Sequence, residues 1–105
     1  MYTRNVSMKL KVNSAKEFTQ TLENEVIPVL RKQKGFKDEI TLIAAERNDA
    51  VAISFWDKKE DAEVYNREKY PEVLRTLSKV VDGTPKVESF EVANSTSHQI
   101  AAKAA

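Results

Sequence analysis

The sequence contains no cysteine among its 105 residues. This excludes a disulfide scaffold, a thiolate nucleophile and the usual cysteine-based zinc sites. Only two glycines are present, Gly35 and Gly83, so the chain has no phosphate-cradling loop and no dinucleotide-binding fingerprint. One histidine without cysteine does not make a typical first-row metal site, and we expect neither a metal nor another cofactor.

An excess of charge of either sign is also lacking. Seventeen Lys and Arg residues face 16 Asp and Glu residues, for a formal net charge of +1. Such a balance gives no broad field for gathering nucleic acid or anionic membrane. Arg4, Lys9 and Lys11 interrupt the start of the chain, and no apolar run resembles a signal peptide or a membrane span. We expect a cytoplasmic protein with no nucleic-acid and no membrane partner.

Alternating apolar residues predict a first strand over residues 4–12, with one face formed by Val6, Met8, Leu10 and Val12. A helix follows, for which Ser14 is the expected N-cap and Glu17 its capping-box partner. Pro28 removes one backbone donor, so we expect a kink or a restart there, and Gly35 suits the left-handed end. The core stripe of this helix is Phe18, Leu22, Val26, Val29 and Leu30.

A second helix is expected after two strands over residues 36–56. Asp57 is its predicted N-cap, with Glu60 as the capping partner. Pro71 marks the first turn of a second helical segment, and Gly83 and Pro85 stop the helix before a last strand over residues 86–92. The buried side is predicted to be Ala62, Tyr65, Val73, Leu74, Leu77, Val80 and Val81.

This β-α-β-β-α-β order predicts an α+β, ferredoxin-like fold, with two helices on one face of a four-stranded antiparallel sheet. We expect a single domain over residues 1–92. Residues 93–105 then form a C-terminal tail that is either frayed or an arm across a partner subunit.

The middle hairpin, turned by Asn48-Asp49, is apolar on both of its faces. Ile43, Ala45, Ala52 and Trp56 oppose a side formed by Leu42, Ile53 and Phe55. Helices on one face of the sheet leave the other bare, and an open apolar face would forfeit several kcal/mol at roughly 25 cal/mol per Å². We therefore predict a homodimer that pairs through the sheet faces, as a dimeric α/β barrel.

Three segments carry a resemblance to a known family. In SFWDKKEDAEVYNREKYPEVLRTL, a strand-end tryptophan and a charged turn lead into a helix with aromatic and polar residues. VIPVLRKQKGF ends a helix with a proline and then Gly-Phe before a strand, and EVANSTSHQIAA closes the chain. Together they resemble the antibiotic biosynthesis monooxygenase superfamily, the dimeric α/β-barrel proteins, over nearly the whole chain.

The resemblance implies a pocket between the helices and the sheet of each subunit. Some members oxidise aromatic polyketides with dioxygen and no metal or flavin, others degrade haem, and many have no known activity. Haem-degrading members use a histidine on the second helix, with a nearby tryptophan and an asparagine on the first strand. Here the second helix carries Tyr65 and Tyr70 but no histidine, and Val6 stands at the asparagine position. Haem degradation is therefore not favoured.

Two functions remain as hypotheses. The first is a cofactor-independent monooxygenase of an aromatic or quinol-like molecule. Tyr65, Asn66 or Tyr70 would donate hydrogen bonds to the substrate oxygen, and His98 would serve as the base. The alternative is a non-catalytic dimeric module that binds an apolar or aromatic small molecule or has a stress-responsive role.

The candidate residues also have simpler interpretations. Large rings at strand ends usually pack in cores or interfaces, and a lone histidine in a polar tail is usually a surface residue. Tyrosines at helical spacing are equally typical of an amphipathic core. The candidates for chemistry are Tyr65, Tyr70 and His98, and those for the substrate pocket are Phe55, Trp56, Asn66 and Arg67.

RNA-recognition domains share the same element order. They expose aromatic residues on the first and third strands, with a Lys/Arg-Gly-aromatic motif. The predicted first strand, RNVSMKLKV, has no aromatic residue, and the third strand has no glycine. RNA binding is therefore not expected.

Overall fold

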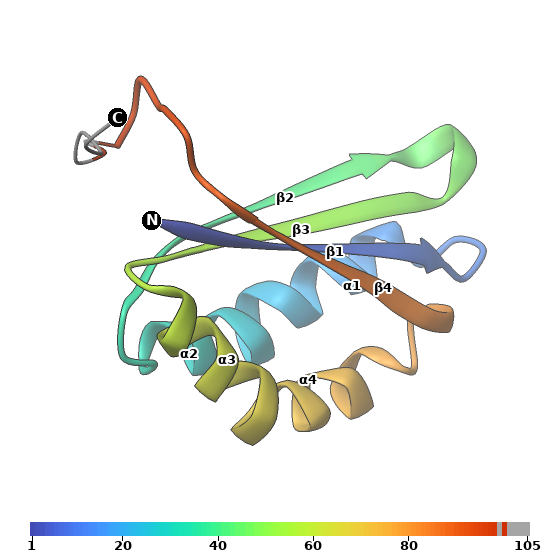
Figure 1. Ribbon diagram of the computed structural model, residues 1–105. Coiled ribbons are helices and arrows are strands. Elements are labelled where there is room, and N and C mark those ends of the chain that lie inside the picture. The colour runs from blue at the N-terminus through green and yellow to red at the C-terminus, as the bar shows by residue number, and fades with distance from the viewer. Residues whose placement is uncertain (99, 101–105) are drawn as a thin grey trace.

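The computed structural model describes residues 1–98 and 100. Four antiparallel strands form one sheet in the order β2-β3-β1-β4. The helices lie together on one face of this sheet (Figure 1). The predicted α+β, ferredoxin-like fold is therefore confirmed. The strands are β1 (Tyr2–Leu10), β2 (Phe36–Ala44), β3 (Asp49–Trp56) and β4 (Val81–Glu91).

Each of the two predicted helices is divided near a proline. The first consists of α1 (Ala15–Thr21), a π-helical turn (Leu22–Val26) and α2 (Ile27–Arg31), which has Pro28 in its first turn. The second consists of α3 (Lys59–Glu68) and α4 (Tyr70–Leu77), which begins with Tyr70 and Pro71. Proline has no N–H for the preceding turn, so both restarts, which the sequence predicts, are confirmed. Among residues 1–98 and 100, no helix has the length and apolar character needed to cross a membrane.

The core lies between the sheet and the helices. Even-numbered residues of β1 and β3 face the helices, because side chains alternate along a strand and the two strands pair in register as Val6–Ala52 and Met8–Ala50. Burying each large apolar side chain contributes roughly 1.5–3 kcal/mol. The helical side of the core consists of Phe18, Leu22, Val26, Leu30, Ala62, Tyr65, Tyr70, Val73 and Leu77.

The opposite face of the sheet carries exposed apolar side chains. Leu42 and Phe90 are each 52% exposed, and Ile40 is 45% exposed. Ile40 pairs with Ile53, and Leu42 with Val51, so these side chains gather on one surface. The predicted apolar character of both faces of the hairpin is confirmed. We call this surface the open-face patch: Ile40, Leu42, Val51, Ile53, Phe55 and Phe90.

Ser14 is the N-cap of α1, as predicted, but neither predicted capping box forms. Ser14 makes no side-chain cap bond, and its hydroxyl donates instead to the Val12 carbonyl at 3.5 Å. The N-cap of α3 is Lys58, one residue after the predicted Asp57. The Asp57 carboxylate pairs instead with Lys37 at 3.4 Å.

The hairpin and the ends of the outer elements also differ from prediction. The β2–β3 turn contains a 3-10 turn, Ala45–Arg47, and Asn48 at φ 55°, while Asp49 already belongs to β3. Helix α4 ends before Gly83 and Pro85, which lie within β4, beside a break in its register with β1. Proline is tolerated there because β4 is an edge strand. Strand β1 ends at Leu10, which leaves Val12 75% exposed.

Candidate functional site

A pocket opens between the sheet and the helices. Its cavity volume is about 40 Å³. Its polar lining is Arg4, Glu39, Ser54, Tyr65 and Tyr70. The remaining lining is apolar and consists of Val6, Met8, Leu22, Val26, Leu30, Ala52, Val73 and Leu77.

Three of the polar residues form a row across neighbouring strands. Arg4 of β1 pairs with Ser54 of β3, and Ser54 pairs with Glu39 of β2. With strands spaced about 4.8 Å apart, the Cα atoms of Arg4 and Glu39 are separated by about 10 Å. A cation and a carboxyl group therefore flank Ser54 on the helix-facing side of the sheet.

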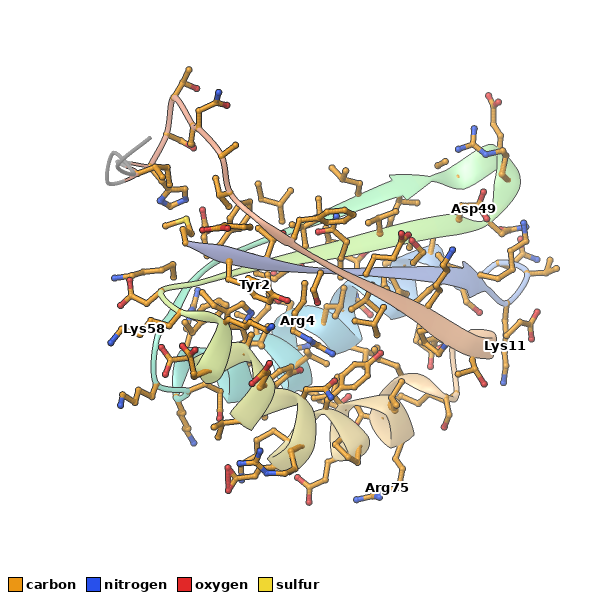
Figure 2. All side chains as sticks on the ribbon, in the orientation of Figure 1. Tyr2, Arg4, Lys11, Asp49, Lys58 and Arg75 are labelled. Carbon is orange, nitrogen blue, oxygen red and sulfur yellow. The ribbon has the colours of Figure 1, made fainter. Side chains whose placement is uncertain are left out.

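Arg4 is the most unusual residue of the site, because its guanidinium is buried and has no anionic partner. The residue is only 4% exposed and extends between the sheet and the helices (Figure 2). Its guanidinium carbon lies 4.4 Å from the Tyr70 ring centroid and 5.1 Å from that of Tyr65. Within residues 1–98 and 100, no carboxylate lies within 4 Å of it. Burial lowers the pKa of Arg4, yet arginine remains charged in proteins.

The two tyrosines supply phenol groups next to this cation. Their ring centroids are 6.2 Å apart. Burial raises the pKa of Tyr65 to about 12, and burial also raises the pKa of Tyr70. Both phenols therefore stay protonated at neutral pH and act as hydrogen-bond donors. In the described part of the chain, the buried hydroxyl of Tyr70 has no partner in hydrogen-bonding geometry, although Arg4 lies beside it.

Among residues 1–98 and 100, Glu39 supplies the only carboxyl group of the pocket lining. It is half-buried, and it accepts a hydrogen bond of 2.7 Å from the Thr41 hydroxyl. Burial raises the pKa of Glu39, with a smaller contribution from Asp38, while the Thr41 hydrogen bond opposes them. A carboxyl group in this setting holds its proton at a higher pH than an exposed glutamate does.

A wider groove lies on the other side of Arg4, between α3 and β4. Its volume is about 310 Å³, and it is open to solvent. Arg4 lines both this groove and the inner pocket, and it donates a 2.8 Å hydrogen bond to the amide oxygen of Asn66. The Arg4–Asn66 pair therefore lies between the two spaces.

Comparison with known proteins relates this architecture to solved structures. No family model matches the sequence, and no curated protein matches it. A monooxygenase of Streptomyces coelicolor, solved with the ligand nanaomycin D, has a TM-score of 0.76 and 14% identity over 90% of this chain and 88% of that chain. A Nitrosomonas europaea protein of unknown function has a TM-score of 0.75 and 11% identity, over 97% and 95%. A further structure, named as an antibiotic biosynthesis monooxygenase, has a TM-score of 0.70 and 8% identity, over 90% and 100%.

The chain has the fold of the antibiotic biosynthesis monooxygenases. This confirms the fold that the sequence resemblance implies for the single chain. At identities of 8–14%, the likeness concerns the backbone and carries no residue roles with it. The chemistry of the site must therefore be argued from the side chains of this chain.

Within this antibiotic biosynthesis monooxygenase fold, Tyr65 and Tyr70 come together in the pocket, as their sequence positions suggest. Asn66 lies at the outer groove, where it meets Arg4. Trp56 is fully buried behind the pocket, and its ring centroid lies 5.1 Å from that of Tyr65, with the two rings tilted by 32°. Its indole N–H donates to the Ser54 hydroxyl at 2.9 Å. Trp56 supports two lining residues and is not itself part of the lining.

The other three candidates lie elsewhere. Phe55 belongs to the open-face patch on the far side of the sheet. His98 lies on that side too, 3.3 Å from the Asp38 carboxylate and with its ring 5.5 Å from that of Phe55. Arg67 is exposed on α3 and reaches Glu68 at 4.0 Å. The structure thus brings none of these three together with Tyr65 and Tyr70.

Arg4, Glu39 and Ser54 were not among the residues that sequence reasoning selected. Charged residues in a strand are usually taken as solvent-facing. The alternation of side chains along β1 nevertheless indicates which face Arg4 occupies. Arg4 shares its face of β1 with Val6 and Met8, and it therefore points to the core. A charge on a core-facing position is uncommon and indicates a functional role.

Proposed function

We propose that this chain is a cofactor-independent monooxygenase of the antibiotic biosynthesis monooxygenase type that acts on an aromatic or quinol-like small molecule. The observation that carries this proposal is the buried guanidinium of Arg4 beside an apolar pocket. A buried charge without a counter-ion costs several kcal/mol, which an anionic ligand would offset. The shared fold of a monooxygenase found with nanaomycin D supports the same proposal.

The chemistry requires a substrate that reduces dioxygen from its own anion. Arg4 would stabilise the negative charge that develops on a substrate oxygen, and the protonated phenols of Tyr65 and Tyr70 would donate hydrogen bonds to it. The apolar lining would exclude water and strengthen each of these interactions. In this account the protein supplies desolvation and charge stabilisation, and the substrate supplies the electrons.

The route to the pocket follows from its size. About 40 Å³ does not accommodate an aromatic ring system, so binding must displace side chains. The wider groove on the far side of Arg4 and Asn66 is the natural approach. Release of the Arg4–Asn66 hydrogen bond would join the two spaces and free the guanidinium for the substrate.

We further propose a homodimer formed through the open-face patch. Leu42 and Phe90 would lose their exposed area against a second copy of the same sheet, as in a dimeric α/β barrel. A contiguous exposed apolar surface is typical of an interaction site. In two copies related by a twofold axis, each open-face patch would bury the other, so no different partner is needed.

A non-catalytic binding module is the second candidate. The position of His98 favours it, because the histidine that the sequence offers as a base lies on the far side of the sheet from the pocket. Such a module would bind an apolar or aromatic molecule at the same residues without consuming oxygen.

The test is oxygen uptake by the purified protein with a panel of anthrones and hydroquinones. The proposal predicts uptake well above the rate without protein, with one atom of ¹⁸O₂ appearing in the product. Binding of a panel member without uptake would support the binding module. If panel members neither bind nor react, both functions are wrong.

A further inference from the structure

We propose that Glu39 is the residue that accepts the acidic proton of the substrate, and that the substrate places this proton and its charge-bearing oxygen on opposite sides of a ring. This inference rests on the proposed function and names a catalytic residue for it. The row Glu39–Ser54–Arg4 carries the inference, because Glu39 and Arg4 stand on strands at either side of Ser54 and both line one pocket.

Elimination among the lining residues favours Glu39 as the base. Tyr65 and Tyr70 retain their protons at neutral pH, and Arg4 retains its charge. The Ser54 hydroxyl already accepts the indole N–H of Trp56. Glu39 is the remaining lining group that can take up a proton, and its setting moves its pKa toward the range that suits a general base.

The surroundings of Glu39 leave its carboxyl available to a ligand. Its one hydrogen bond to a side chain in the described residues comes from Thr41 on its own strand. Asp38 is adjacent, but its carboxylate lies on the other side of the sheet, where it meets His98. The charged or titratable groups that share the pocket are Arg4 from β1, Tyr65 from α3 and Tyr70 from α4. The helical segments over residues 15–31 contribute only apolar side chains to the lining.

The geometry favours a ring with its acidic hydrogen and an oxygen in para positions, as in an anthrone or a hydroquinone. For an anthrone, a C–H bond breaks, the proton passes to Glu39, and the electron pair becomes an enolate whose oxygen faces Arg4. The carbanionic carbon adds dioxygen, Glu39 returns the proton to the resulting peroxide, and loss of water leaves a carbonyl. The balance is R₂CH₂ + O₂ → R₂C=O + H₂O, with dioxygen as the oxidant.

The test compares the pH dependence of kcat/KM for wild-type protein and Glu39→Gln with an anthrone as substrate. We expect Glu39→Gln to lower kcat/KM by about 10²- to 10⁴-fold and to abolish the acid limb of the profile. Glu46→Gln, at the exposed hairpin turn, is the matched control and should leave the profile unchanged. Added formate should restore part of the activity of Glu39→Ala, which a purely structural role would not allow.

The outcomes distinguish the role of Glu39 from the proposed monooxygenase activity on which it rests. If wild-type protein consumes no oxygen with any panel member, both are wrong. If wild-type protein is active and Glu39→Gln keeps its rate and its acid limb, only the role of Glu39 is overturned. An inactive Glu39→Ala that formate does not rescue also overturns it, provided that the variant's thermal unfolding matches that of the wild type.

Discussion

Arg4 donates a hydrogen bond of 2.8 Å to the side-chain oxygen of Asn66 and so ties strand β1 to helix α3. The bond holds the guanidinium between the inner pocket and the outer groove. Asn66 is the one polar side chain that bonds Arg4 in the described part of the chain, and it is neutral. The pair can therefore open without breaking an ion pair.

Replacing Asn66 with Ala should destabilise the protein modestly. The change removes a hydrogen bond to a charged group, so we expect a loss of about 1–2 kcal/mol in the free energy of unfolding, measured by urea denaturation. Asn24→Ala, at an exposed position in the π-helical turn, is the control and should cost less than 0.5 kcal/mol, roughly the range for surface changes. Equal losses in the two variants would show that the Arg4–Asn66 bond does not stabilise the fold.

Replacing Asn66 with Asp should raise stability and lower activity. The new carboxylate would form an ion pair with Arg4, and the guanidinium would then not be available to the substrate.

Tyr65 should be among the last phenols to ionise. Its pKa is raised to about 12, so its neutral form contributes stability below pH 10, the ordinary tyrosine value, and this contribution is lost as the pH rises through about 12. Two pKa units correspond to roughly 3 kcal/mol. Absorbance titration of wild-type protein and Tyr65→Phe should differ by one transition near pH 12. A difference transition near pH 10 would show that Tyr65 is solvated.

The open-face patch makes the assembly testable. Light scattering with size-exclusion chromatography should give a dimer for the wild-type protein and a monomer for Leu42→Lys, because the lysine would be buried against the partner sheet. Val12→Lys is the matched control, since Val12 is 75% exposed but lies beyond the end of β1. A monomeric wild type, or a dimer that persists in Leu42→Lys, would contradict pairing through this face.

The two glycines should respond differently to alanine. Both have positive φ, 79° at Gly35 and 69° at Gly83, where a side chain costs about 1–2 kcal/mol. A Cβ at Gly35 would also collide with the Asp61 carboxylate, whereas nothing lies within 4 Å of a Cβ at Gly83. Gly35→Ala should therefore lower the free energy of unfolding more than Gly83→Ala. Equal losses in urea denaturation would mean that Asp61 moves aside freely.

The fold was predictable from the sequence because apolar alternation and helical spacing report burial directly. Val6, Met8 and Leu10 behave as their pattern indicates, and Pro28 and Pro71 restart helices for a local steric reason. The capping of the helices was not predictable. Asp57 does not cap the helix but pairs with Lys37, which is 20 positions away in the chain and becomes its neighbour only in the folded protein.

The site was predictable only in part. Tyr65 ends up beside Tyr70 because the helix breaks between α3 and α4, and the sequence predicts this break from Pro71. The row that includes Arg4 and Glu39 depends on the order of three strands and on their register. A pattern within one strand cannot supply that register. His98 lies far along the chain, and its contact with Asp38 could not be read from periodicity.

The central claim is that the buried guanidinium of Arg4 binds the anionic oxygen of the substrate. Oxygen uptake with an anthrone by Arg4→Met, compared with Arg75→Met on the exposed side of α4, tests it most directly. We predict that Arg4→Met stays folded and loses no more than about 1–2 kcal/mol in the free energy of unfolding, because removing a buried charge that has no counter-ion offsets the lost hydrogen bond to Asn66. Its kcat/KM should fall by about 10²- to 10³-fold, while Arg75→Met stays near the wild-type value. A folded Arg4→Met that consumes oxygen at the wild-type rate would contradict the account.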